Sequence, residues 1–471
     1  MSLRLVPTTF MAAMLLLCSG AATAAGSLIT YIADVTGVRE LYAVIPKTSA
    51  VIKVNLPLPP DAGVYSAVVH PKGTSIIYEA DQEILDIYRL YRADLKTGTV
   101  LPLTPPMLDG TSFHGYAVDA KGASVVYVGE QDTTDVRELY RVDLKTGIGT
   151  KLNPPLVPGG DIQDFAIDPK GRFVVYQADQ EVDGVYELFR VDIKTRVVTK
   201  LNPPLVTDGD VSEFAIDAKS RFVVYRADQE VNGVSELYLA DLRTGSVIKL
   251  NAPMGSGGSV SSFRIDYKGA SVLYLADQDI DSVRELYRVV LKTGQVSKLN
   301  PPLSGNRDVS DGYQIDRKGA FVVYRADQDA DGDHELFKVD LLTSVVSQLT
   351  PPLIPGGDVE IFQIHPDGIN VIYTADQEVV DQRELYRINT ITGVVNQLNL
   401  PLLQDRGVRS FLLEPRGAGV LYLADQAVDS VEELFRVALE AGTVTRLNAP
   451  LPPQGEVDEY TVQGILFPNE Y

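Results

Sequence analysis

The chain has 471 residues, of which 63 are Asp or Glu and 42 are Lys or Arg, so its formal net charge is −21 at pH 7. This acidity disfavours binding to nucleic acid and to anionic membrane surfaces; it favours cationic partners or divalent ions, and it also serves solubility. The one cysteine, Cys18, lies in a predicted leader, so we expect a mature chain without disulfides, thiol nucleophiles or cysteine-ligated zinc. No later run of 18 apolar residues occurs, which excludes a transmembrane helix beyond that leader.

Residues 1–25 have the features of a signal peptide. Arg4 precedes a short apolar run, Phe10–Cys18, and Ala22–Ala24 supplies the small residues that a signal peptidase requires. An uncleaved anchor is the alternative, although the run is too short to span a bilayer. Lipidation of Cys18 is disfavoured by the bulky Leu17 before it. The sequence therefore predicts an exported protein, periplasmic or extracellular, whose folded domain covers residues 26–471.

One sequence unit of about 49 residues repeats through the remainder of the chain. Each copy contains a β-rich run that ends in Ala-Asp-Gln or a close variant. The acidic position of that motif falls at Asp34, Asp81, Glu130, Asp179, Asp228, Asp277, Asp327, Asp376 and Asp425. A period near fifty residues with only strand-like segments predicts the blades of a β-propeller rather than a helical repeat.

Each unit contains four predicted strands, which are clearest in the copy that begins at Asp161. They cover residues 162–168, 173–179, 186–193 and 197–202, separated by turns rich in Pro, Gly, Asp and Asn. The second strand is continuously apolar at residues 173–176, as expected for a strand covered on both faces by neighbouring blades. The sequence therefore predicts an all-β fold of four-stranded blades.

The two ends of the repeat region predict how the propeller closes. The region starts with a second-strand sequence at residues 28–34 and ends with a first-strand sequence at residues 458–463. First strands and second strands both number nine, so the last strand can complete the first blade and remove an exposed edge. By this count we expect a single closed propeller of nine blades. An open, slightly superhelical array is the structural alternative.

Three segments resemble the PD40, or WD40-like, repeats of the TolB β-propeller family. They are the Phe-x-Ile-Asp-x-Lys-Gly stretch at Phe165–Gly171, the third strand and turn at Glu138–Gly147, and Lys151–Asn153. The resemblance implies a propeller that serves as a binding platform or as part of a hydrolase. The chain departs from the family in the loop after the second strand, which is short at Asp34–Glu40 and longer in most later copies.

The longer loops predict calcium sites. In residues 327–335, oxygen ligands stand at positions 1, 3, 5 and 9 with glycine at position 6, the pattern of a calcium loop, and this stretch resembles the nine-residue calcium loops of integrin α propellers. The alternative is a hairpin in which the first Asp caps backbone N–H groups and the final Glu pairs with Arg. The candidate ligands are Asp327, Asp329, Asp331 and Glu335; Asp179, Glu181, Asp183 and Glu187; Asp228, Glu230, Asn232 and Glu236; and Asp277, Asp279, Asp281 and Glu285.

The order of strands also predicts two faces of different charge. The loops after second strands should share a face with the proline-rich loops between blades, such as Asn153–Leu156, whereas the Pro-Lys-Gly and Lys-Thr-Gly turns should line the opposite face. The first face is therefore acidic and the second more basic. A face or a channel mouth is where propellers usually bind ligands, so the acidic face is the candidate site for a cationic partner.

No catalytic motif was found in the sequence. The four histidines, His70, His114, His334 and His365, belong to different copies, and there is no paired metal-ligand spacing and no Gly-x-Ser-x-Gly elbow. The leading hypothesis is a non-enzymatic platform that binds a protein, peptide or glycan. The alternatives are an enzyme at the channel mouth, namely a glycan lyase or hydrolase or a peptidase accessory, and a purely structural envelope protein. An enzyme should break the repeat at channel-facing positions, whereas a platform should keep it and vary its loops.

Overall fold

The computed structural model describes residues 27–463, except residues 36, 47, 109–110, 112, 330–331, 403–405, 429 and 453. The predicted signal peptide and Asp331 of the predicted calcium loop therefore lie outside the described residues. Every regular element in the described part is a β-strand, 36 in all. Within that part, no helix is long and apolar enough to cross a membrane.

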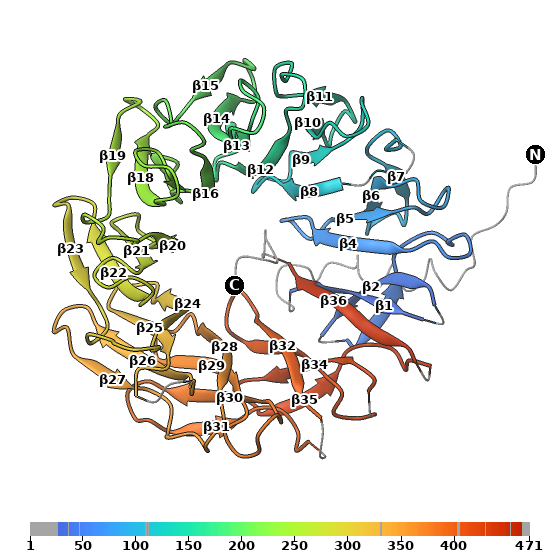
Figure 1. Ribbon diagram of the computed structural model, residues 1–471. Helices are drawn as coiled ribbons and strands as arrows, with labels where there is room; N and C mark the ends of the chain where they lie inside the picture. The colour runs from blue at the N-terminus through green and yellow to red at the C-terminus, as the bar shows by residue number, and fades with distance from the viewer. Residues whose placement is uncertain are drawn as a thin grey trace, which may run out of the picture. The chain divides into compact units, whose positions relative to one another are not determined.

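The strands form nine four-stranded antiparallel sheets, the blades of a nine-bladed β-propeller (Figure 1). The predicted fold class is confirmed. The chain divides into unit 1, residues 1–153 and 408–471, and unit 2, residues 154–407. We number the strands of each blade first to fourth in the order in which they lie side by side.

Unit 1 contains four blades, with strands β36 (Glu456–Val462), β1 (Ile29–Asp34), β2 (Arg39–Ile45) and β3 (Ala50–Lys53); β4 (Val64–Val69), β5 (Ser75–Ala80), β6 (Arg89–Asp94) and β7 (Val100–Pro102); β8 (Phe113–Val118), β9 (Ser124–Gly129), β10 (Glu138–Asp143) and β11 (Gly149–Lys151); and β32 (Val408–Leu413), β33 (Gly419–Ala424), β34 (Glu433–Ala438) and β35 (Thr443–Arg446).

Unit 2 contains five blades, with strands β12 (Ile162–Ile167), β13 (Phe173–Ala178), β14 (Glu187–Asp192) and β15 (Val198–Lys200); β16 (Val211–Ile216), β17 (Phe222–Ala227), β18 (Glu236–Asp241) and β19 (Val247–Lys249); β20 (Val260–Ile265), β21 (Ser271–Ala276), β22 (Glu285–Val290) and β23 (Gln295–Lys298); β24 (Val309–Ile315), β25 (Phe321–Ala326), β26 (Glu335–Asp340) and β27 (Val346–Gln348); and β28 (Val359–Ile364), β29 (Asn370–Ala375), β30 (Glu384–Asn389) and β31 (Val395–Gln397).

The last strand completes the first blade, as the sequence predicted. β36 pairs antiparallel with β1, with Ile29 opposite Val462 and Tyr31 opposite Tyr460. One sheet of unit 1 therefore contains both a strand from the start and a strand from the end of the described chain. A closed propeller requires this pairing, and an open array does not.

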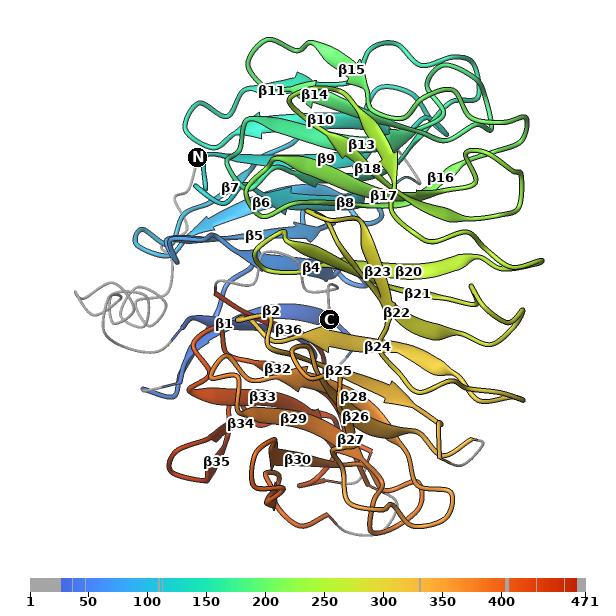
Figure 2. The ribbon, with the colours of Figure 1, turned by 90° about the vertical axis from the view of Figure 1, so that its left-hand side faces the viewer.

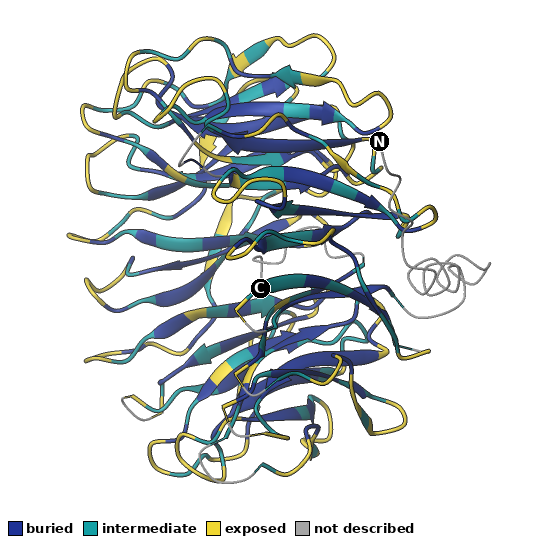
Figure 3. Ribbon diagram, turned by 90° about the vertical axis from the view of Figure 1, so that its right-hand side faces the viewer, coloured by how far each residue is buried: buried dark blue, intermediate teal, exposed yellow. Residues whose placement is uncertain are grey.

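Second strands are buried on both faces because successive blades stack face against face. All six residues of β13 are buried, and a single apolar cluster joins Val224 of β17 to Val272 and Tyr274 of β21. Figure 2 shows the stacked sheets of unit 2 from the side, and Figure 3 shows buried residues along the strands and exposed residues in the loops. The continuous apolar runs in the sequence reflect this double burial.

Each blade has an aromatic pair at its centre, and this pair explains the Gln of the Ala-Asp-Gln motif. Tyr176 of β13 lies opposite Phe189 of β14, and their ring centroids are 5.6 Å apart in a stacked arrangement. The equivalent rings of all nine blades stack at 5.2–5.6 Å. The buried Tyr176 hydroxyl donates to Gln180 Oε1 at 2.7 Å. A buried phenol needs such a partner, which the motif supplies.

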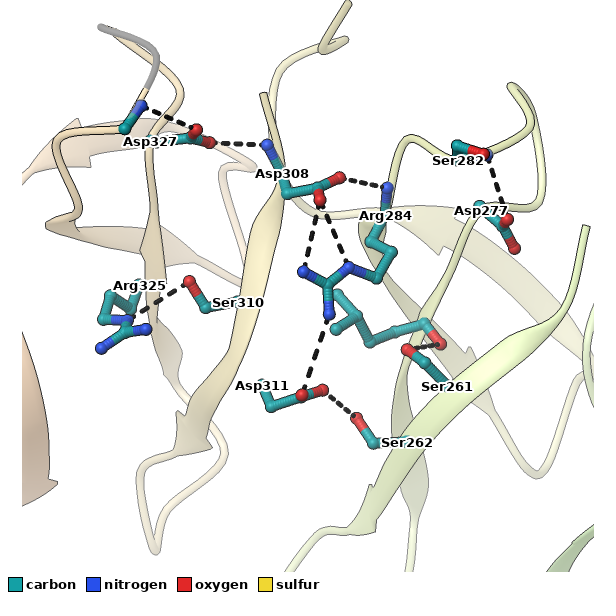
Figure 4. Close-up of polar contacts among 12 residues, drawn as sticks. Ser261, Ser262, Asp277, Ser282, Arg284, Asp308, Ser310, Asp311, Arg325 and Asp327 are labelled. Carbon is teal, nitrogen blue, oxygen red and sulfur yellow. Dashed lines mark hydrogen bonds and ion pairs between the residues drawn. The ribbon is translucent and has the colours of Figure 1, made fainter. Parts of the chain in front are cut away.

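The Asp of the motif ties together two loops of its own blade. Asp228 Oδ1 accepts the backbone N–H of Asp210, which precedes the first strand, at 2.5 Å. Asp228 Oδ2 accepts the N–H of Gly233, in the loop after the second strand, at 3.0 Å. The same two contacts recur at Asp327, which binds the N–H groups of Asp308 and Gly332 (Figure 4). The first Asp is therefore a backbone cap, as one of the two sequence interpretations proposed.

We expect Asp228→Ala to lower the free energy of unfolding by about 3 kcal/mol, because two backbone N–H groups lose charged acceptors worth roughly 1.5–3 kcal/mol each. Asp228→Asn keeps one acceptor oxygen and should lose about half as much. Urea unfolding of the three proteins measures the difference. A loss below about 1 kcal/mol in Asp228→Ala would contradict the capping role.

Candidate functional site: the acidic side of unit 2

In unit 2 the loops after second strands contact the proline-rich loops between blades. The N–H groups of Val157, Val206 and Gly255 donate to the carbonyls of Gln180, Gln229 and Gln278 at 3.4, 3.2 and 2.9 Å. This is the arrangement that the strand order predicted. We call the loops at residues 179–186, 228–235, 277–284, 327–334 and 376–383 the acidic side of unit 2.

The turn between the first and second strands contacts the turn between the third and fourth strands. Both turns lie at the strand ends opposite the acidic side. The N–H of Ile193 donates to the carbonyl of Arg172 at 2.9 Å, and the copies at Leu242 and Leu291 repeat this contact. The turns between the first and second strands of successive blades are linked by a row of lysines. Lys170 Nζ donates to the carbonyl of Lys219 at 2.5 Å, and Lys219 Nζ donates to that of Lys268 at 3.1 Å. This lysine row therefore lies at the strand ends opposite the acidic side, where Asp168 and Asp217 of the same turns pair with Arg172 and Arg221.

Three of the four predicted calcium loops already hold a cation, which is a lysine of the fourth strand. Lys249 Nζ lies 2.7 Å from both Glu230 and Glu236, the third and ninth positions of its loop. The same bridges join Lys200 to Glu181 and Glu187, and Lys298 to Asp279 and Glu285. The ninth-position Glu also accepts the side-chain amide of an Asn, as in Asn251 Nδ2 with Glu236 Oε1 at 3.4 Å.

These lysines correct one detail of the sequence interpretation, which paired the final Glu with Arg. In unit 2 the residue that pairs with Glu187, Glu236 and Glu285 is Lys, because the fourth strand places residues 200, 249 and 298 opposite the third-strand aromatic ring. Although burial acts to lower the pKa of Lys249, the hydrogen bonds with Glu230 and Glu236 raise it above its ordinary value. The ammonium therefore stays charged and offsets one of the two negative charges of the carboxylate pair.

The loop at residues 327–335 differs because it has no such lysine. Gln348 occupies the fourth-strand position, and its Nε2 donates to Glu335 Oε1 at 2.7 Å. Burial, together with Asp329 and Asp333, raises the pKa of Glu335. No group of three or more His, Cys, Asp or Glu side chains is arranged to hold a metal among the residues that the structure describes, a set that lacks Asp331. Calcium at this loop stays a prediction, and its carboxylates fit a cation better than those of the lysine-filled loops.

If calcium binds at residues 327–335, it should raise the unfolding temperature, because a ligand that binds only the native state stabilises it. Gln348→Lys should reduce that rise, since the introduced ammonium competes for Glu335 and Asp329. Thermal unfolding with calcium and with excess chelator measures both effects. Lys298→Gln in the neighbouring blade is the matched control, because it tests whether removing a lysine is enough to create a calcium-dependent rise in the unfolding temperature. Equal calcium shifts in wild type and Gln348→Lys would contradict this site.

The fourth position carries an exposed aliphatic side chain in four of these five loops; in the other loop it is residue 330, which lies outside the described residues. Val182, Val231, Ile280 and Val379 are 56, 55, 49 and 51 % exposed. An acidic residue precedes each one, at Glu181, Glu230, Asp279 and Glu378. Single exposed aliphatic residues are ordinary on protein surfaces; what is particular to these four is that each directly follows an acidic residue.

The first strands contain the residues that break the repeat, and the sequence interpretation did not single them out. Burial raises the pKa of both Asp164, on β12, and Glu213, on β16; Arg226, 3.5 Å from Glu213, opposes this effect at Glu213. The sequence does show where the repeat breaks, because one first-strand position holds a different residue type in each blade of unit 2. That position holds Asp164, Glu213, Ser262, Gly312 and Ile361, each beside an irregularity in strand pairing.

The close-up in Figure 4 shows how two neighbouring blades meet at these first strands. Arg284 binds Asp308 through Nε and Nη2 at 3.3 and 3.2 Å, and its Nη1 lies 3.8 Å from Asp311. Ser262 Oγ donates to Asp311 Oδ1 at 3.3 Å. Because Asp311 is exposed on β24, its carboxylate is also accessible to a ligand.

The histidines are distributed as the sequence suggested. His70 and His365 occupy turns, where their Nδ1 atoms accept the N–H groups of Lys72 and Asp367 at 3.1 and 3.2 Å. His334 Nδ1 lies 3.3 Å from Asp358, at the edge of the acidic side.

No protein-family model matches the sequence, and no curated protein matches it. Solved structures share its fold. The dipeptidyl peptidase 4 of Porphyromonas gingivalis aligns with a TM-score of 0.60 and 12 % identity, over 81 % of this chain and 59 % of that chain. A structure from a study of two prolyl endopeptidases aligns with a TM-score of 0.47 and 14 % identity, over 78 % of this chain and 54 % of that chain. An oligogalacturonate lyase in complex with manganese aligns with a TM-score of 0.44 and 14 % identity, over 78 % of this chain and 99 % of that chain.

The chain thus spans about three fifths of the length of the peptidase that it matches with the TM-score of 0.60. At 12 % identity this likeness confirms the propeller fold and carries no activity with it. The TolB-like family stays a resemblance in sequence.

Proposed function

We propose that this protein is an exported, non-enzymatic binding module, and that the acidic side of unit 2 binds a basic polypeptide segment with aliphatic side chains. The observation that carries the proposal is the repetition of an acidic residue followed by an exposed aliphatic one in the loops at Val182, Val231, Ile280 and Val379. A partner in which cationic and aliphatic groups alternate matches both features of this surface.

Charge supports a cationic partner. The lysines of unit 2 that could screen the surface lie at the opposite strand ends or are already bound to carboxylates within the loops. Exposed carboxylates such as Asp183 and Asp281 remain at the loop tips. A surface of one sign attracts an oppositely charged partner at long range and increases the association rate.

The chemistry of the exposed apolar groups favours a polypeptide over a glycan. Sites for small molecules are usually concave and lined with aromatic side chains. On the acidic side of unit 2 the large exposed apolar residues are aliphatic, and the exposed aromatic residue of this unit, Tyr267, lies in a turn at the opposite strand ends.

We expect a labelled peptide in which Lys and Val alternate to bind the protein, as measured by fluorescence anisotropy. Binding should weaken as salt increases, because exposed charges are screened. A peptide with Glu in place of Lys should not bind, and one with Ser in place of Val should bind more weakly. Combining Val182→Ser, Val231→Ser and Ile280→Ser should reduce affinity by about tenfold, because buried aliphatic contacts are lost.

The matched control combines Val197→Ser and Ile248→Ser, which change similarly exposed aliphatic residues beside the fourth strand β15 and within the fourth strand β19 of the same unit. This control should bind as wild type does. The proposal would be contradicted if the Glu peptide bound as tightly as the Lys peptide, or if both sets of variants lost affinity equally. Cleavage of the bound peptide would instead support the enzymatic alternative, which the first-strand carboxylates Glu213 and Asp311, each with an arginine nearby, favour.

A further inference from the structure

One position of the second strand links neighbouring blades and has an unusual occupant in unit 1. In three of the five blades of unit 2 this position holds Gln177, Arg226 and Arg325, whose side chains donate to the backbone carbonyls of Val211, Val260 and Val359 in the next blade. In the β4–β7 blade the equivalent residue is Glu79 on β5. A carboxylate only accepts hydrogen bonds, whereas a protonated carboxyl group can also donate, so the kind of contact that Glu79 makes depends on its protonation.

Glu79 forms the end of a chain of hydrogen bonds that crosses into the β8–β11 blade. Ser66 Oγ, on β4, lies 3.2 Å from Glu79 Oε2 and 3.1 Å from the Tyr116 hydroxyl on β8. Serine–tyrosine pairs also join first strands at Ser262 with Tyr313 and at Ser410 with Tyr460. In those two pairs the second-strand residue opposite the serine is a leucine, Leu275 or Leu423, whereas Glu79 lies opposite Ser66.

The direction of this chain depends on the charge of the carboxyl group. An ionised Glu79 only accepts, so Ser66 must donate to it and Tyr116 must donate to Ser66. A protonated Glu79 can donate to Ser66, which is then free to donate to Tyr116. The protonated arrangement places no net charge in the junction between the two blades.

The surroundings of Glu79 favour its neutral form below about pH 7. Burial is the largest effect and raises the pKa of Glu79 to about 7; Glu459 on β36 adds to the increase, whereas hydrogen bonds with Ser66 and with the backbone of Phe113 oppose it. Tyr116 and Tyr88, which also face Glu79, have raised pKa values and stay neutral in this range. Below neutral pH, therefore, the native state holds a proton that the unfolded chain releases at its ordinary pKa near 4.5.

We propose that Glu79 is a proton-operated contact between the β4–β7 and β8–β11 blades of unit 1, closed when the carboxyl group is neutral and loosened when it ionises. The folded-state pKa is the higher one, so the stabilisation is fully present below the unfolded pKa and is lost as the pH rises through the folded pKa. The junction should accordingly weaken between about pH 4.5 and pH 7, and change little above that range.

Hydrogen exchange of β4, β5 and β8 amides in the full chain tests this proposal. After correction for the intrinsic pH dependence of exchange, wild-type protection should fall by at least about tenfold between pH 5 and pH 8. Glu79→Gln should remove that fall, because its amide resembles Gln177 of unit 2 and does not titrate. The same fall in Glu79→Gln as in wild type would overturn the proposal.

Two further variants keep the proposal testable if Glu79→Gln folds poorly. Glu459→Gln changes an exposed residue and removes a repulsive charge, so it should move the midpoint of the change to lower pH. Gln177→Glu should introduce a comparable pH dependence in the β12–β15 and β16–β19 blades of unit 2. An unmoved midpoint in Glu459→Gln together with a pH-independent Gln177→Glu would also overturn the proposal.

Discussion

The blades depend on the carboxylate that ends each second strand. In the β16–β19 blade, Asp228 accepts two backbone N–H groups, one before the first strand and one in the following loop. These N–H groups cannot pair within the sheet, and an unpaired buried donor is costly. The adjacent Gln229 accepts the hydroxyl of a buried tyrosine at 2.7 Å. A short motif thus satisfies three polar groups that the stacking of blades removes from water.

This structural use of carboxylates explains why counting acidic residues is a poor guide to function. Much of the acidity of the loops is committed: first-position Asp residues cap the backbone, and ninth-position Glu residues share a lysine with third-position acids. What distinguishes the surface is what these interactions leave exposed, namely loop-tip carboxylates and aliphatic side chains such as Val182. In the proposed function each copy would offer a weak contact, and a partner that engages several copies would gain affinity through multivalency.

The sequence predicted the fold because the main features of the blade recur in copy after copy of the repeat. The period, the doubly buried second strands and the first-strand sequence at residues 458–463 were enough to predict closure. The site was harder to predict. The calcium interpretation read the loop positions in isolation, and the lysines that bind Glu187 and Glu236 lie 13 residues further along the chain. Glu79 and Glu213 were missed because their properties arise from burial and from neighbouring blades, which the repeat pattern does not reveal.

The central claim is that acidic side chains and exposed aliphatic side chains of unit 2 together form a surface for a basic polypeptide. The most direct measurement is an unbiased selection from a random peptide library displayed on phage, using the full chain as bait. We predict enrichment of sequences that alternate Lys or Arg with aliphatic residues, with protection from hydrogen exchange in the loops at residues 179–186, 228–235 and 277–284 when such a peptide is bound. Enrichment of acidic or uncharged sequences, or protection at the lysine row instead, would contradict the account.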